Sequence, residues 1–368
     1  MFPAGHDWRA GVTYTVVHAG TGITGREALR GLIDDPELVL AGVLVSSPDK
    51  AGRDAGALCG RPDTGVIAHD DFDAVLREKP DCFCYCSTAV GREEDAYNDI
   101  ARLLRHGINV VTISTIPMVY PAAAPEKWQR LLESACAEGG STFYASGCEP
   151  GIVSLNLPVA LMAGAGQVDS YRMDEYAIDL DLVYPIWEVL HESMGFGKPD
   201  GHVPARIASG KVRHDWEAVV RYTADALGIA LDTVDLDWET VLAPEDLTTA
   251  LGPLPKGTIC GHRWRLAGIS RGEAVVAVQY FATVSSTPWP GSWPRPEGGA
   301  GMVHRIEGRP SMRLQMSFES GPGERAMPSL SFTGQAVVNA IPHVVDSAPG
   351  LLEPVLGRSV VTRQARRS

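Results

Sequence analysis

Short apolar runs alternate with amphipathic segments over the first 150 residues. Residues 14–17 and 38–45 are rich in β-branched side chains and predict strands, whereas 26–33 between them has helical spacing. Further strands are predicted at 64–68, 82–86, 108–113 and 142–146, and further helices at 71–77, 93–106 and 126–138. Strands that alternate with helices in this way predict a parallel, doubly wound α/β sheet of the Rossmann type.

The pattern changes after residue 150. A helix is predicted at 152–163, with Pro158 as a kink, and another at 216–227. The remaining apolar runs read as strands with little helix between them, at 170–178, 258–269, 273–284, 302–307 and 311–319. Such a run of strands predicts an α+β domain with a largely antiparallel sheet. We therefore expect a nucleotide-binding domain over 1–150 and a substrate-binding and dimerisation domain over 151–326, with a helix at about 327–347 returning to the first.

A glycine-rich turn joins the first predicted strand to the first helix. Its glycines follow the spacing of the dinucleotide-binding fingerprint: Gly20 permits the tight turn, Gly22 lets backbone approach a pyrophosphate, and Gly25 lets helix and strand pack closely. The residues between them, Thr21, Ile23 and Thr24, belong to the same turn. Free N–H groups at the helix start then bind the phosphates.

The end of the second predicted strand indicates which nucleotide binds. An NAD enzyme places a carboxylate there against the adenine ribose. Here Ser46 and Ser47 follow the strand, with Lys50 and Arg53 shortly after, and these groups suit a 2′-phosphate. Asp49 is the only nearby acid. We expect NADP rather than NAD.

Hydroxyl side chains follow two later strands. Ser87 and Thr88 come after the strand at 82–86, and Ser114 and Thr115 after the strand at 108–113. Ligands of doubly wound sheets bind beyond the carboxyl ends of the strands, so these four residues are predicted near the nicotinamide. It is equally consistent with the sequence that these four residues only form turns and cap helices.

Composition excludes several functional classes. The net charge of −13 over 368 residues argues against a nucleic-acid-binding protein, and the chain has no apolar run of about 18 residues that would span a membrane. Seven cysteines and no secretory signal pattern predict reduced thiols and a cytoplasmic protein. Cys82, Cys84 and Cys86 alternate along one strand, which places three sulfurs in a row on one face. We interpret them as core residues and expect no metal site.

Several motifs occur in the order found in a known family. They are Gly20–Arg26, the Val-Ser-Ser-Pro-Asp-Lys stretch at 45–50, Gly147-x-x-Pro-Gly151, Met194–Gly197 and Val338–Pro342. Together they resemble the dihydrodipicolinate-reductase-like oxidoreductases, a group that includes 2,4-diaminopentanoate dehydrogenase and the native amine dehydrogenases. The resemblance spans nearly the whole chain. It implies hydride transfer between NAD(P) and a carbon–nitrogen bond of a small substrate, in a two-domain homodimer.

One family feature is missing from this sequence. The resemblance implies an acidic residue just after the strand that ends near Thr112, where it orients ammonia and the iminium. Residues 114–120 here contain no acid. The family's catalytic residue is therefore not carried over.

Four other residues are candidates for the chemistry. Glu149 ends the last parallel strand, Glu175 and Tyr176 lie in the first strand of the second domain, and His191 precedes a glycine-rich loop. A carboxylate suits a cationic imine, whereas a tyrosine or histidine suits a carbonyl. The alternatives are that Glu149 only interacts with the dipole of the following helix, and that Glu175 and Tyr176 belong to an exposed acidic strand face. The alternative for His191 is a structural role. A carbonyl or enamine reductase with a Tyr or His acid, and a non-catalytic NADP-binding sensor, remain rival functions. The sequence leaves the substrate and the direction of the reaction open.

Overall fold

The computed structural model describes residues 13–285, 287–296, 299–319 and 328–355. The chain forms two compact units. The first runs to Pro121, continues over Pro125–Cys148 and resumes at Leu330; the second comprises Ala122–Ala124 and Glu149–Ser329. The units therefore divide between Cys148 and Glu149, and the C-terminal helices belong to the first unit. Residue 327, where the sequence placed the start of the returning helix, lies outside the described residues.

A six-stranded sheet, parallel throughout, forms the centre of the first unit. Its strand order is β2-β1-β3-β4-β5-β14. The strands are β1 (Tyr14–Ala19), β2 (Leu38–Leu44), β3 (Cys82–Tyr85), β4 (Asn109–Thr112), β5 (Thr142–Ala145) and β14 (Gly350–Leu351). The predicted Rossmann-type sheet is thus confirmed. Because β2 and β3 flank β1 on opposite sides, the order reverses at β1, and ligands of such sheets bind at this switch point.

The strand predicted at 64–68 is wrong. The segment makes only single bridges, such as Ile67 with Asp54. The Asp54 carboxylate accepts hydrogen bonds from the backbone N–H groups of Thr64 and Gly65, which fixes this segment as a turn.

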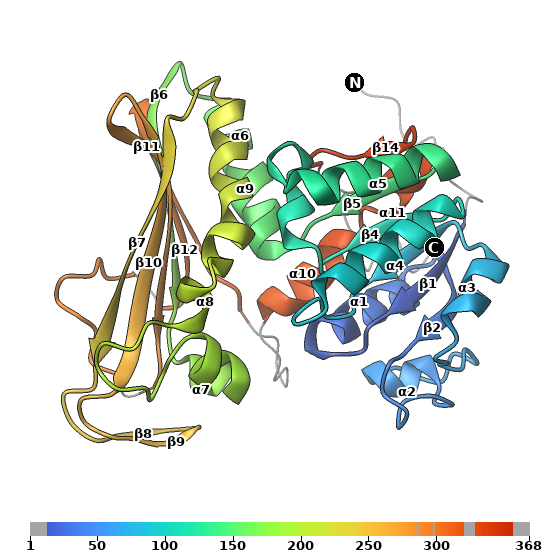
Figure 1. Ribbon diagram of the computed structural model, residues 1–368, viewed down its shortest axis with the longest axis horizontal. Coiled ribbons are helices and arrows are strands. Elements are labelled where there is room, and N and C mark those ends of the chain that lie inside the picture. The colour runs from blue at the N-terminus through green and yellow to red at the C-terminus, as the bar shows by residue number, and fades with distance from the viewer. Residues whose placement is uncertain (1–12, 286, 297–298, 320–327, 356–368) are drawn as a thin grey trace, which may run out of the picture. The chain divides into compact units, whose positions relative to one another are not determined.

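Helices cover both faces of this sheet (Figure 1). They are α1 (Ile23–Asp34), α2 (Ala55–Cys59), α3 (Phe72–Glu78), α4 (Glu93–Arg105), α5 (Glu126–Gly139), α10 (Pro328–Val338) and α11 (Ile341–Asp346), with short 3-10 turns η1 (Ile116–Val119) and η2 (Pro121–Ala123). Helices α1, α10 and α11 share one apolar core with β1, β3, β4 and β5. Helices α4 and α5 pack side by side against β4 and β5. Acidic residues in the first turn of α4 and arginines in its last turn complement the helix dipole.

The second unit contains a six-stranded, mostly antiparallel sheet in the order β13-β12-β6-β11-β10-β7. Its strands are β6 (Gln167–Ala177), β7 (Thr233–Leu242), β10 (Ile259–Ser270), β11 (Glu273–Thr283), β12 (Gly301–Arg309) and β13 (Met312–Met316). Only β6 and β11 pair in parallel. A small hairpin joins β8 (Leu247–Thr249) to β9 (Gly252–Leu254). The predicted α+β architecture is confirmed, although the sequence pattern missed β7, whose mostly exposed side chains give no apolar run.

Helices α6, α8 and α9 lie along one face of this second sheet (Figure 1). The helical elements are the turn η3 (Cys148–Asn156), α6 (Leu157–Met162), α7 (Leu180–Val183), the turn η4 (Glu188–Ser193), α8 (Ala205–Ala208) and α9 (Lys211–Ala226). The single helix predicted at 152–163 is divided between η3 and α6. Helical backbone continues from η3 into α6, since Asn156 between them is αR, and Pro158 lies where the π-type turn passes into the α-helix.

Strand periodicity divides β6 between two cores. Tyr171 and Met173 face the core that contains α9, whereas Tyr176 packs with Phe281 and Trp293 on the opposite face. Glu175, two residues after Met173, therefore lies on the helix-covered face.

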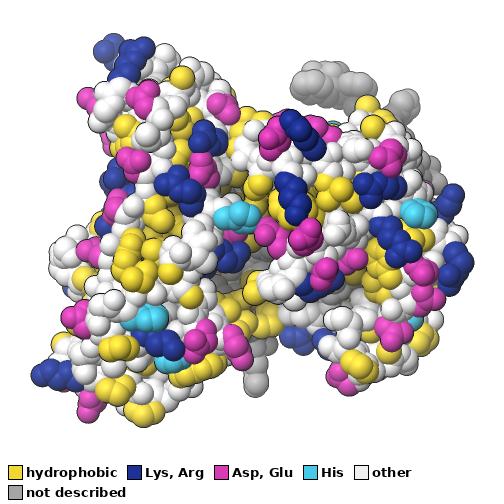
Figure 2. Space-filling view, viewed as in Figure 1, with side chains coloured by type: hydrophobic (Ala, Val, Ile, Leu, Met, Phe, Trp, Pro, Cys, Tyr) yellow, Lys and Arg dark blue, Asp and Glu magenta, His cyan; other side chains and the backbone are white. Residues whose placement is uncertain are grey.

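The charged surface is mixed. Basic and acidic side chains are interspersed over the face drawn in Figure 2 and do not gather by sign. Within the described ranges, no helix has both the length and the apolarity needed to cross a bilayer.

Candidate functional site

The glycine turn lies directly after β1, at the switch point of the first sheet. Gly20 has φ +96°, a conformation that L side chains rarely adopt, and a Cβ there would lie 2.4 Å from the backbone of Cys86. A Cβ on Gly25 would lie 2.0 Å from the Gly20 carbonyl oxygen. These two positions therefore require glycine to let β1, β3 and α1 approach one another.

Gly22 differs from the other two glycines. A Cβ on Gly22 would have no atom within 4 Å, so the space beside it is open. Gly22 is also the N-cap of α1 and, having no side chain, leaves the first N–H groups of the helix without a side-chain cap. An open approach to uncapped helical N–H groups is the arrangement that binds a pyrophosphate.

Lys50 connects the end of β2 to the glycine turn. Its ammonium donates a hydrogen bond to the Thr21 carbonyl oxygen at 3.3 Å. Ser46 and Arg53 are exposed, and Ser47 and Lys50 are partly buried in the same loop. In the part of the chain that the structure describes, neither Lys50 nor Arg53 pairs with a carboxylate. Two uncompensated positive charges thus lie in this loop.

The hydroxyl residues after β3 and β4 lie at the same end of the sheet. A Cβ built on Gly20 would lie 2.5 Å from the backbone nitrogen of Ser87, so Ser87 lies beside the glycine turn. The Thr88 hydroxyl accepts a hydrogen bond from Val90, and Ser114 donates to the Tyr85 carbonyl oxygen at 3.4 Å, so both have turn-forming roles. Thr115 is 2% exposed, and its hydroxyl has no hydrogen-bond partner among the described residues.

The second unit holds two neighbouring carboxyl groups. Glu149 lies in extended backbone at the start of η3, and Glu175 lies on β6. Burial raises the pKa of Glu149 well above its ordinary value, and the nearby charge of Glu175 raises it further, while Ser154 opposes the shift. Burial raises the pKa of Glu175 to about 7, although the Arg206 guanidinium lowers it. Burial and the neighbouring carboxyl group thus favour the protonated form of Glu149, and Glu175 exchanges its proton near pH 7.

Both oxygens of the Glu149 carboxyl group are buried without a hydrogen-bond partner in the described chain. Unpaired buried oxygens are costly, and such groups are found where a ligand supplies the missing donor. The pair is thus able to accept hydrogen bonds from a substrate.

Aromatic side chains and Arg206 surround Glu175. Tyr280 on β11 is the register partner of Glu175, and Trp264 on β10 stacks on Tyr280 with ring centroids 5.6 Å apart. Arg206 on α8 lies over the Tyr280 ring, 5.9 Å from its centroid. Aromatic faces attract cations. The surroundings of Glu175 are therefore aromatic and apolar, with one guanidinium close by.

His262 adds a neutral imidazole to this region. It is 2% exposed on β10, and its ring centroid is 6.0 Å from that of Tyr280. Burial lowers the pKa of His262 to about 3, and the Arg206 charge lowers it too, so the ring is uncharged at neutral pH. Its Nδ1 hydrogen-bonds the Met194 carbonyl oxygen at 3.2 Å, and its Nε2 has no partner among the residues described.

The other two predicted residues lie elsewhere in the second unit. Tyr176 stacks on Phe281 on the opposite face of the sheet from Glu175. His191 stacks on Trp187, and its Nδ1 hydrogen-bonds the Phe196 carbonyl oxygen at 2.7 Å. The structure thus brings Glu149 and Glu175 together, separates Tyr176 from them, and gives His191 contacts that support the loop before Gly197.

Sequence reasoning missed Arg206, His262 and Tyr280. Arg206 follows a short Pro-Ala stretch, and the other two lie in strands that carry further polar residues such as Arg263 and Gln279. Strand pairing brings Tyr280 beside Glu175, whereas Arg206 approaches from α8 and His262 lies next to the Tyr280 ring. Period-two alternation was the one available signal, since it marks His262, Trp264 and, across the sheet, Tyr280 as inward-facing.

The first unit fits a dinucleotide. The open side of Gly22, the uncapped helix start and the unpaired Lys50 and Arg53 all offer donors or positive charge to phosphates. The residues that would hold the nucleotide come from the turn after β1 and from the loops after β2, β3 and β4.

Comparisons with known proteins agree with this architecture. The model of the 2,4-diaminopentanoate dehydrogenase C-terminal domain matches residues 191–356. A curated amine dehydrogenase of Streptomyces virginiae is 31% identical over 354 residues, which cover 92% of this chain and 96% of that relative.

Solved structures share the fold. Amine dehydrogenase from Mycobacterium smegmatis superposes with a TM-score of 0.71 at 21% identity, over 95% of this chain and 97% of that one. GenD2 from gentamicin A biosynthesis, solved with NAD, gives a TM-score of 0.54 at 16% identity, over 96% of this chain and 92% of that one. The whole-length identity to the Streptomyces enzyme is the decisive finding: this chain belongs to the family of NAD(P)-dependent oxidoreductases that contains the amine dehydrogenases and 2,4-diaminopentanoate dehydrogenase.

Proposed function

We propose that this protein is an NADP-dependent amine dehydrogenase acting on a small primary amine, in which the Glu149–Glu175 pair binds the nitrogen and accepts its proton. The observation that carries the proposal is the pair itself: two neighbouring carboxyl groups, one with unpartnered buried oxygens, beside aromatic rings. Family membership supports the reaction class. The pair also supplies the acid that is missing after Thr112.

The chemistry of an amine places two demands on these residues. An ammonium ion must lose a proton before its carbon can release hydride, and the iminium product carries a positive charge. Glu175, with a pKa of about 7, takes the proton from the ammonium group and leaves a neutral amine with a free lone pair. NADP⁺, when bound, would supply the hydride acceptor for the substrate carbon. Once Glu175 has passed this proton to solvent, its restored carboxylate stabilises the positive iminium, and water converts the iminium to a carbonyl compound and ammonia.

Arg206 and His262 limit the charge of the site. The Arg206 guanidinium favours the ionised form of Glu175, and the uncharged ring of His262 adds no second positive charge that would repel an ammonium ion. The ring of Tyr280, the register partner of Glu175, offers an apolar surface to the carbon skeleton of the substrate.

The test of this function is a panel of small primary amines assayed with NADP⁺, together with the reverse assay of carbonyl compounds with ammonia and NADPH. Amine-dependent reduction of NADP⁺, and NADPH oxidation that requires ammonia, are expected. Carbonyl reduction without ammonia identifies a carbonyl reductase instead. Tight NADPH binding with no turnover of any amine, imine or carbonyl identifies a sensor.

The proposed preference for NADP rests on the loop after β2. Replacing both Lys50 and Arg53 with alanine removes the two unpaired charges that a 2′-phosphate would contact, so NADPH binding is expected to weaken by about 10- to 100-fold while NADH binding changes little. Calorimetry with both nucleotides measures the difference. Lys127→Ala, which removes an exposed lysine paired with Glu94 on the same unit, is the matched control. Equal losses for the two nucleotides would contradict the phosphate assignment.

We further propose that the protein acts in the cytoplasm as a homodimer. The dimer follows from the family resemblance, and the seven buried cysteines, none of which forms a disulfide in the described chain, support a reducing compartment. Sedimentation equilibrium decides the oligomeric state, for which a mass twice the 39.4 kDa of the chain is expected.

A further inference from the structure

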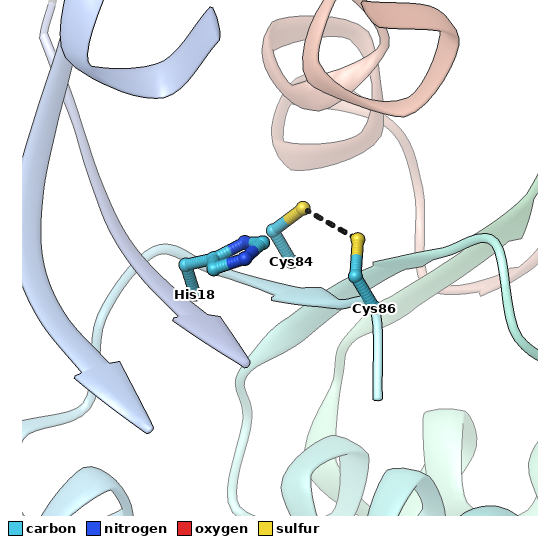
Figure 3. Close-up of side chains that lie close together, drawn as sticks. All are labelled: His18, Cys84 and Cys86. Atoms are coloured by element: carbon cyan, nitrogen blue, oxygen red, sulfur yellow. Dashed lines mark hydrogen bonds between the residues drawn. The ribbon is translucent and has the colours of Figure 1, made fainter. Parts of the chain in front are cut away.

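Three potential metal ligands meet beneath the glycine turn, outside the residues assigned to the nucleotide. They are His18 on β1, Cys84 on β3 and Cys86 just after β3 (Figure 3). The ring nitrogen and the two sulfur atoms all lie within 4.8 Å of one another. The strand register explains the meeting, because His18 and Cys84 are partners in the parallel pairing of β1 with β3. Cys86 follows two residues later on the same face of the strand.

The two sulfur atoms are spaced as metal ligands. Cys84 Sγ and Cys86 Sγ are 3.7 Å apart. A tetrahedral zinc ion with Zn–S bonds of about 2.3 Å holds two thiolates about 3.8 Å apart. Cys82 lies in the same apolar cluster but is not part of the ligand group, so the row of three cysteines divides into one core residue and two potential ligands.

The His18 ring is oriented for ligation. Its Nε2 lies 2.7 Å from the Gly20 carbonyl oxygen, which sets the ring so that Nε2 carries the proton. Nδ1 then keeps its lone pair, and this buried atom has no hydrogen-bond partner within the described ranges. His18 is 0% exposed. A metal-binding histidine usually donates its other ring N–H to a backbone carbonyl or a carboxylate. His18 makes this contact with Gly20, while its remaining nitrogen faces the two sulfur atoms.

Thiol ionisation agrees with this geometry. A hydrogen bond with Cys86 lowers the pKa of Cys84 to about 6 despite burial, and the adjacent His18 lowers it too. The same contact raises the pKa of Cys86. A thiolate is the form in which cysteine binds a metal, and metal binding itself displaces the thiol protons.

We propose that His18, Cys84 and Cys86 form a binding site for a thiophilic d¹⁰ cation, with Zn²⁺ as the representative ion. Thiolate and imidazole donors select such ions over Mg²⁺ or Ca²⁺. Among the described residues the cluster offers three ligands, which leaves one position for water or a small anion. Binding displaces the thiol protons of Cys84 and Cys86 to solvent and forms two Zn–S bonds and one Zn–N bond. Because Nε2 of His18 contacts Gly20 and the N–H of Cys86 donates to the Ala19 carbonyl oxygen, the ion would tie β1 and β3 together beneath the turn.

X-ray absorption at the zinc edge tests this site on the wild-type protein. The protein is produced in zinc-supplemented culture, so that the ion is present while the chain folds, and is purified under reducing conditions. We expect about one zinc per chain, with two sulfur neighbours at about 2.3 Å and nitrogen or oxygen neighbours at about 2.0 Å. A protein without zinc, or zinc surrounded by oxygen and nitrogen alone, overturns the proposal.

Variants then assign the ligands. Cys84→Ser and Cys86→Ser are each expected to lose the sulfur-ligated zinc, while Cys82→Ser, a buried cysteine of the same strand, keeps it. Co²⁺ substitution gives a second measurement, because thiolate-to-cobalt charge-transfer absorption appears only when sulfur binds the ion. Circular dichroism confirms that each variant is folded. Equal zinc content and unchanged cobalt spectra in all three variants would contradict the assignment.

Discussion

At the scale of single residues, the environment of Glu175 determines its chemistry. Burial among aromatic rings raises the pKa of this carboxyl group to about 7, and one guanidinium, on Arg206, limits the rise. An exposed glutamate would already be ionised at this pH and could not alternate between its two forms there. The position of Glu175 on the helix-covered face of β6 is therefore what makes it a proton acceptor.

Removing this carboxylate is expected to remove catalysis without unfolding the protein. In Glu175→Gln we expect kcat/KM for the amine to fall by about 10²- to 10⁴-fold. In the wild type, kcat/KM should rise with pH up to about 7 and then level off as Glu175 loses its proton; this limb should be absent in the variant. Steady-state assays from pH 5 to 9 measure both effects. Glu273→Gln, an exposed glutamate on β11, is the control. An unchanged profile in Glu175→Gln excludes Glu175 from the mechanism.

The same pKa predicts how stability depends on pH. The unfolded chain releases the Glu175 proton near pH 4.5, and the folded chain releases it near pH 7. Between these values the folded state binds more protons, so the free energy of unfolding decreases as pH rises. Above about pH 7 Glu175 is ionised in the folded state, so the full cost of burying its charge lowers the free energy of unfolding. Denaturant titrations of the wild type and Glu175→Gln from pH 5 to 8 should therefore converge towards low pH and diverge towards high pH, with the variant more stable at pH 8. A constant difference between them would contradict the raised pKa.

At the scale of elements, the glycines of one turn have separate physical roles. Gly25 lets α1 approach the carbonyl of Gly20, whereas Gly22 keeps the approach to the helix start open. The first role is structural and the second concerns ligand binding, although the fingerprint joins both in one motif.

Alanine substitutions are expected to separate these roles. A Cβ at Gly25 would lie 2.0 Å from a backbone oxygen, so Gly25→Ala should destabilise the first unit strongly or prevent its folding. A Cβ at Gly22 meets no atom within 4 Å, so Gly22→Ala should fold with wild-type stability. It should nevertheless lose most NADPH affinity, because the methyl group occupies the space beside the phosphate-binding N–H groups. Thermal unfolding and calorimetry measure the two effects. Unimpaired NADPH binding by Gly22→Ala would place the phosphates elsewhere.

At the scale of the whole molecule, the nucleotide and the buried carboxyl pair belong to different compact units. Each unit has its own sheet and its own apolar core. Ligand binding should therefore be visible unit by unit, because a ligand stabilises the part of the chain that contacts it.

Hydrogen exchange with and without NADPH tests this separation. Protection is expected at the turn after β1 and in the loops after β2, β3 and β4, with slower exchange through α1. The strands β10 and β11 should change little with the nucleotide alone. Peptides from α9, a helix of the second unit, serve as the internal control. Protection confined to the second unit would refute the assignment of the nucleotide to the first.

Local pattern predicted much of this organisation. Strand and helix periodicity placed β1 to β5 and most of the second sheet, since each is an apolar run bounded by turn residues. Exposed β7 gave no such run, and the strand predicted at 64–68 failed because Asp54 binds the backbone there. Of the four catalytic candidates, two lie together and Tyr176 faces away, because neighbours along a strand point to opposite faces.

The sequence by itself determined the order of most elements of both sheets, the glycine turn and the basic residues after β2, because each depends on residues that are close along the chain. Only the tertiary structure decided which side chains share a site. Glu149, Glu175, Arg206 and His262 come from separate elements, and so do His18 and the two cysteines beside it. Their pKa values and unpartnered atoms arise from burial and strand register. These properties depend on contacts between distant residues, which no local pattern specifies.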